Sequence, residues 1–91
     1  MHVIRARLIR GGGPRDSGGV AVPIEDLLWA HAVPAIGLEH IRARPTQGGL
    51  DVYLFIDAPD EPRALAQVRD LLIRAGGAIT TQGYAAPAAS D

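Results

Sequence analysis

The sequence predicts a small α+β domain, and three observations lead to this fold class. The chain has 91 residues, of which 47% are hydrophobic and 21% are charged, as is typical of one folded globular unit. Apolar residues recur with a period of two in some segments, which predicts strands. In other segments they recur at i, i+3, i+4 and i+7, which predicts amphipathic helices.

The first element is a predicted β-strand over residues 2–10. Its side chains alternate, with Ile4, Ala6 and Leu8 on one side and Arg5 and Arg7 on the other. This alternation predicts one buried face and one face in water. The nine residues that follow, 11–19, contain five glycines and a proline, and so predict a flexible loop.

A helix is predicted from Pro23 to about Val33. Proline suits the first helical position, and the carboxylates of Glu25 and Asp26 interact favourably with the N-terminal end of the helix dipole. Pro34 forbids much continuation. The predicted inward stripe consists of Ile24, Leu27, Leu28 and His31.

A β-hairpin is predicted next, with strands over residues 38–44 and 50–57 and a four-residue loop over 46–49. Placing Pro45 opposite Leu50 makes both faces chemically consistent at once, and a one-residue slip would destroy this agreement. The pairs predicted inside are Ala43 with Val52 and Ile41 with Leu54. The pairs predicted outside are Arg44 with Asp51, Arg42 with Tyr53, and His40 with Phe55.

A second helix is predicted from an N-cap at Asp60 to a left-handed C-terminal residue at Gly76. A last short strand is predicted over residues 78–84. The Ala/Pro-rich residues 85–91 are expected to form a disordered tail, which leaves a single domain over residues 1–84.

The order strand, helix, strand, strand, helix, strand is similar to the split βαβ arrangement of ferredoxin-like domains. The resemblance covers residues 2–84 by the pattern of elements only. It implies a four-stranded antiparallel sheet with two helices on one face and with the first and third strands in the centre. Because this superfold hosts unrelated functions, function has to be argued from a site.

The candidate site is the sheet face that the helices leave open. Two aromatic rings in the middle of that face, Tyr53 and Phe55, predict that another molecule covers it. The expected occupant is a second copy of the chain, in a homodimer, with another protein or a small ligand as the alternatives. The predicted binding or dimer-interface residues are Arg5, Arg7, His40, Arg42, Arg44, Asp51, Tyr53, Phe55 and Tyr84, and Thr80 and Gln82 are also expected on this face.

Composition excludes or disfavours several kinds of partner and site. A net charge of −1 and a first strand without an aromatic ring disfavour nucleic acid, although two rings two residues apart are also used by RNA-recognition motifs. The sequence contains no Cys and no metal-ligand spacing among its histidines, so no metal and no cofactor are expected. No membrane segment or leader is apparent, which predicts a cytoplasmic protein.

The sequence therefore predicts a small non-catalytic binding or accessory module that homodimerises through its open sheet face and assists a biosynthetic or regulatory enzyme. The alternative is a cofactor-free small enzyme of the isomerase, cyclase or monooxygenase type. In that enzyme His40 would act as general acid or base and Arg42 would stabilise an oxyanion. A solvent-open cleft around His31 or His40 would favour chemistry, whereas a solidly packed core would favour binding.

Overall fold

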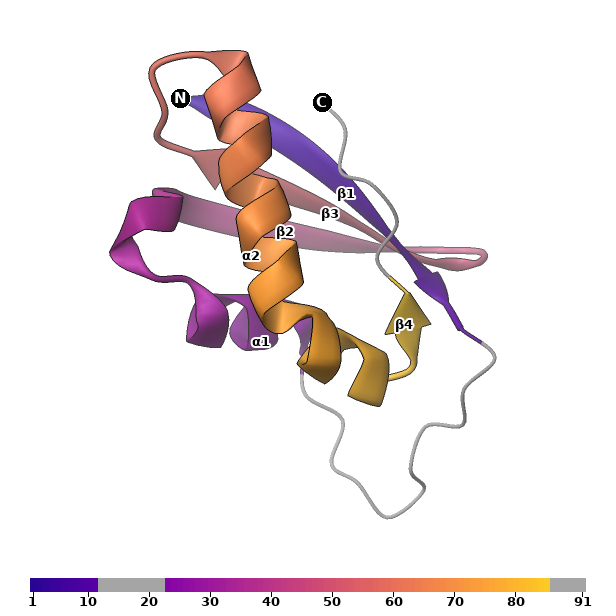
Figure 1. Ribbon diagram of the computed structural model, residues 1–91. Coiled ribbons are helices and arrows are strands. Elements are labelled where there is room, and N and C mark those ends of the chain that lie inside the picture. Colours follow the sequence, from indigo (N-terminus) through magenta and orange to yellow (C-terminus); the bar gives the residue numbers. More distant parts are fainter. Residues whose placement is uncertain (12–22, 86–91) are drawn as a thin grey trace.

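The computed structural model describes residues 1–11 and 23–85, which form an α+β fold with an open four-stranded antiparallel sheet and two helices (Figure 1). The strands are β1 (His2–Arg10), β2 (Leu38–Thr46), β3 (Gly49–Ile56) and β4 (Tyr84–Ala85), in the spatial order β2-β3-β1-β4. The helices are α1 (Ile24–His31) and α2 (Glu61–Thr81), and a short 3-10 helix, η1 (Pro34–Ile36), precedes β2. Residues 12–19 of the predicted loop over 11–19 and residues 86–91 of the predicted tail over 85–91 lie outside the described residues. Ala85 pairs with Ile9 in β4, so the prediction of a disordered tail was wrong at this residue.

The β2–β3 hairpin has the register predicted from the sequence. Pro45 pairs with Leu50, and all five further predicted pairs are present. The loop prediction was wrong in length, because β2 runs to Thr46 and β3 begins at Gly49, which leaves a two-residue turn. An irregularity between Leu38 and His40 ends the regular pairing at the other end of β2.

One face of the sheet and both helices share a single apolar core. The inward stripe predicted for α1 is confirmed at Ile24, Leu27 and Leu28, whereas His31 is only half-buried and places its Nδ1 atom 2.9 Å from the Leu27 carbonyl oxygen. The sheet residues buried in this core are Ile4, Ala6, Leu8, Ile41, Val52, Leu54 and Ile56. Among the described residues no polar or charged side chain is buried.

Helix α2 begins as predicted and ends later than predicted. The Asp60 carboxylate accepts a hydrogen bond of 2.9 Å from the Arg63 backbone N–H, which confirms the N-cap. The helix does not stop at Gly76, because Ile79 falls four residues after the buried Ala75 and is itself only 1% exposed. Burying such a side chain stabilises the fold by about 1.5–3 kcal/mol, enough to offset two glycines at about 1 kcal/mol each.

The longer helix shortens the last strand to Tyr84–Ala85 and places Thr80 on α2 instead of on the sheet. The left-handed residue after the helix is Gly83, with φ of 91°, whose N–H donates to the Thr80 carbonyl at 2.9 Å. The predicted strand over 78–84 was therefore wrong except at its last residue.

Gln67 of α2 connects the helix to the open end of the hairpin, where β2 begins and β3 ends. Its side-chain nitrogen donates to the Ile36 carbonyl at 2.7 Å and to the Asp57 carbonyl at 3.2 Å. The backbone N–H of Asp57 in turn donates to the Gly37 carbonyl at 2.8 Å. These bonds fix the start of β2 and the end of β3 against α2, and so hold the hairpin in place across the core.

We expect Gly77→Ala to raise the free energy of unfolding by about 0.5–1 kcal/mol, because alanine loses less backbone entropy in a helix. No atom lies within 4 Å of the position that the new Cβ would take. Gly49→Ala is the contrast, since its Cβ would overlap the Leu8 carbonyl oxygen, and it should destabilise by about 1–3 kcal/mol. Urea unfolding measures both, and a destabilised Gly77→Ala protein would contradict a helix that runs through this residue.

Candidate binding surface

Nine side chains on three neighbouring strands stand on the sheet face away from the core, and we call this set the grid. Successive residues of a strand point to opposite faces, so the residues between the buried positions of β1, β2 and β3 face outward. The grid consists of Val3, Arg5 and Arg7 from β1, Asp51, Tyr53 and Phe55 from β3, and His40, Arg42 and Arg44 from β2. The register sets them in three rows across the strands.

The first row, His40–Phe55–Val3, is the apolar end of the grid. The rings of His40 and Phe55 have centroids 5.3 Å apart and an interplanar angle of 55°, a tilted aromatic contact. Val3 is 46% exposed beside them. The His40 side chain makes no hydrogen bond with the described residues, so its ring lacks an orienting group.

The second row, Arg42–Tyr53–Arg5, places a half-buried ring between two exposed guanidinium groups. Neither arginine has a hydrogen bond or ion pair with any residue in the described part of the chain. Neighbouring strands lie about 4.8 Å apart, so the two arginine backbones are separated by about 10 Å with Tyr53 in between.

The third row, Arg44–Asp51–Arg7, contains the one carboxylate of the grid. The Arg7 Nε atom donates to the Asp51 Oδ1 atom at 3.1 Å, with 57% of the arginine side chain and 15% of the aspartate side chain exposed. Arg44 pairs with Asp51 in the register but forms no ion pair with it. Arg44 thus joins Arg5 and Arg42 as a third guanidinium group without a partner among residues 1–11 and 23–85.

Tyr84 was predicted on the open face, and the structure places it on the other side. Its register partner is Arg10, which follows the buried Leu8 at a spacing of two, so both residues belong to the helix-covered face. Tyr84 packs against the core, and the Arg10 guanidinium carbon lies 5.6 Å from the centroid of its ring. Thr80 lies in α2 and Gln82 is the C-cap residue of that helix, so the predicted site loses both of these residues as well as Tyr84.

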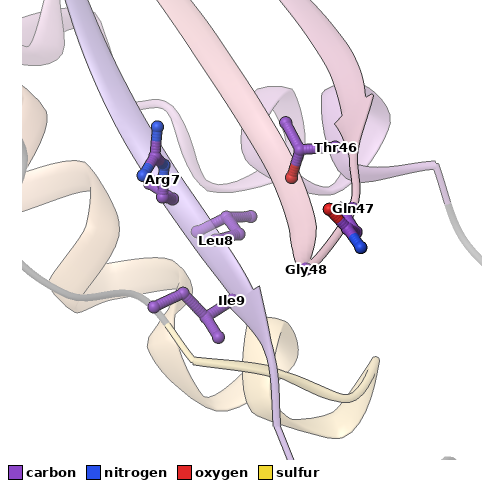
Figure 2. Close-up of a pocket in the computed structure, with 6 residues that line it drawn as sticks. All are labelled: Arg7, Leu8, Ile9, Thr46, Gln47 and Gly48. Atoms are coloured by element: carbon purple, nitrogen blue, oxygen red, sulfur yellow. The ribbon is translucent and has the colours of Figure 1, made fainter.

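Sequence reasoning missed two apolar members of the open face, Val3 and Ile9, each 46% exposed. The signal was present in the alternation of β1, where both are odd-numbered like Arg5 and Arg7. Ile9 lines a hollow of about 410 Å³ at the hairpin turn, together with Arg7 from β1 and with Thr46 and Gln47 (Figure 2).

A second hollow, of about 500 Å³, lies on the grid itself. Its apolar lining is Val3, Tyr53 and Phe55, and its polar lining comes from the β2 arginines Arg42 and Arg44. A surface depression lined by apolar side chains and by two cations suits an apolar group that carries negative charge beside it.

The free edge of β2 is blocked, which directs binding to the face of the sheet. The Glu25 carboxylate of α1 accepts a hydrogen bond of 3.2 Å from the Ala43 backbone N–H. Two residues further on, Pro45 has no N–H to offer to an added strand. Edge-to-edge pairing along this half of β2 is therefore disfavoured.

Comparison with known proteins found no matching protein-family model, no similar curated protein and no similar solved structure. The arrangement of side chains consequently carries the functional argument. In the two described stretches of the chain, no three His, Cys, Asp or Glu side chains come together as a metal site. None of the described helices is long and apolar enough to cross a membrane.

We expect Asp51→Asn to lower the free energy of unfolding by only about 0.5 kcal/mol, because the partner Arg7 is mostly in water and salt bridges of this kind are weak. The loss should shrink at high salt, which screens exposed charges. Urea unfolding at two salt concentrations measures both effects, with Asp70→Asn, which breaks a 3.2 Å pair on α2, as the matched control. A loss above about 2 kcal/mol would mean that the pair is a structural element of the fold and not part of a binding surface.

Proposed function

We propose that this protein is a small non-catalytic binding or accessory module with the ferredoxin-like superfold, and that it works through the grid. The superfold assignment is supported by the element order and by the central position of β1 and β3 in the sheet. An accessory role beside a biosynthetic or regulatory enzyme is compatible with a chain of this size that presents one large patterned face.

The observation that carries the proposal is the second row of the grid. Tyr53 stands in the middle of the sheet between two arginines that have no partner within the described residues. Tyrosine and arginine are the side chains most enriched among residues that dominate binding energy at protein interfaces. A sheet face selected only for solubility would carry charges but would not need two aromatic rings on its central strand β3.

The core supports binding over catalysis. An enzyme that used His40 and Arg42 would need a group to orient the imidazole and a site that excludes water. His40 instead contacts Phe55 on an open face, and no polar side chain is buried anywhere in residues 1–11 and 23–85. No observation favours the enzyme alternative.

Two kinds of occupant fit this function, a second copy of the chain and a different molecule. The homodimer predicted from the sequence would bury the apolar row against a partner and place the arginines at the rim. A different molecule would use the same rings and the 500 Å³ hollow. In both cases Tyr53 lies at the centre of the contact, so one substitution tests both.

We expect Tyr53→Arg to abolish binding through the grid, as measured by light scattering over a range of protein concentrations and by fluorescence of the neutral apolar dye Nile red. If the occupant is a second copy, the wild type has the mass of two chains and the variant the mass of one. If it is a different molecule, the wild type is a single chain that binds the dye while folded, and the variant does not.

Trp29→Arg is the matched control, because it replaces another exposed aromatic residue, 45% exposed, on α1 and outside the grid. It should change neither the mass nor the dye signal. A wild-type protein that stays a single chain at high concentration and binds no dye would show that the grid is a solvent-exposed sheet surface without a binding role. The proposed function would then be wrong.

A further inference from the structure

The charge of the chain is unevenly distributed between the grid and the rest of the sequence. The grid holds four guanidinium groups and one carboxylate, a formal charge of +3 with His40 neutral. Since the whole chain carries −1, the remainder carries −4. The grid is thus a positive surface on a protein that is negative everywhere else on balance, and a ligand of the grid gains from negative charge.

The positive charge of the grid discriminates between the two occupants that the proposed function allows, a second copy of the chain and a different molecule. Stacking two grids face to face would oppose four arginines with four arginines, with one already paired aspartate on each side. Like charges brought together at an interface suppress the wrong partner by a large energetic cost. The second copy is therefore a poorer occupant than a molecule of opposite charge.

A small anion would contact too few of the grid's arginines to account for the whole surface. The 500 Å³ hollow offers Arg42 and Arg44 from β2, but Arg5 lies on β1, beyond Tyr53. The backbones of Arg5 and Arg42 are about 10 Å apart. One carboxylate or phosphate group would leave most of the grid's charge of +3 unmatched, whereas a polymer with several negative charges can engage all three arginines.

Between the two kinds of polyanion, a protein segment fits better than a nucleic acid. The two rings are adjacent on β3, and β1 offers Val3 in place of a further stacking ring. A near-neutral chain also lacks the strongly basic balance that phosphate backbones require.

We infer that the grid recognises an acidic segment of another protein that carries an aromatic or large aliphatic side chain among its carboxylates. The apolar side chain lies in the hollow against Tyr53 and Phe55. Carboxylates on either side of it pair with Arg42 and Arg44 along β2 and with Arg5 on β1, and guanidinium–carboxylate pairs of this kind are bidentate and strong. This inference rests on the proposed function, because it names the occupant of the same surface.

The test uses the whole chain and a random copolymer of glutamate and tyrosine as the probe, with polyglutamate and polyuridylate as comparison polymers. Binding is measured by isothermal titration calorimetry at about 0.05 M and about 0.5 M salt. We expect the copolymer to bind, polyglutamate to bind at least about tenfold more weakly because it lacks the apolar anchor, and both to weaken at the higher salt.

Two double variants with the same change in charge locate the binding. Arg42→Gln with Arg44→Gln removes two cations from the grid and should weaken copolymer binding at least about tenfold. Arg69→Gln with Arg74→Gln removes two cations from α2 and should change it less than about twofold. Circular dichroism and urea unfolding of each variant separate a loss of binding from a loss of folding.

The possible results distinguish a failure of the inferred acidic partner from a failure of the proposed binding function. Copolymer binding that the grid variant loses and the helix variant keeps supports both. A mass of two chains that Tyr53→Arg reduces to one, or binding of polyuridylate without binding of the copolymer, overturns the acidic partner and leaves the binding function standing. Equal effects of the two double variants also overturn the inference. A single chain that binds neither polymer nor dye overturns both.

Discussion

The pairing of β2 with β3 is the constraint on which the rest of the molecule depends. Each residue pair in this hairpin assigns one face of the sheet to the core and the other to water, so the register decides both at once. A slip by one residue inverts one strand relative to the other. It would either turn Val52 and Leu54 of β3 to solvent, with Tyr53 under the helices, or turn the arginines of β2 under the helices. Burying unpaired guanidinium groups in an apolar core is far more costly than any gain from a different turn.

From this register follows a strict separation of roles. The core beneath the helices is built from aliphatic side chains, and among the described residues it contains no buried polar group. The charged side chains of the described residues therefore lie outside the core, and so do the rings of Tyr53 and Phe55. The grid brings nine outward positions together, because β1, β2 and β3 run side by side for several residues (Figure 1) and the register aligns these positions in rows.

The sequence predicted most of this arrangement where two independent patterns agreed. The hairpin register was predictable because apolar pairs inside and charge-complementary pairs outside select the same alignment. The end of α2 was not, since Gly76 and Gly77 give a strong local stop signal and only the three-dimensional core reveals that Ile79 has somewhere to bury. That error moved the last strand and with it Tyr84, whose face depends on its pairing with Arg10. The hollow on the grid combines side chains from two strands with Val3 from a third, and no stretch of sequence contains it.

The rate of thiol labelling at single cysteines introduced at neighbouring positions of β3 tests the central claim most directly, because the chain has no other cysteine. The Tyr53→Cys protein should react rapidly while folded. The Leu54→Cys protein should react only as fast as the protein unfolds. Rapid reaction at position 54, or a reaction at position 53 that is slow in the free single chain, would contradict the assignment of these residues to opposite faces.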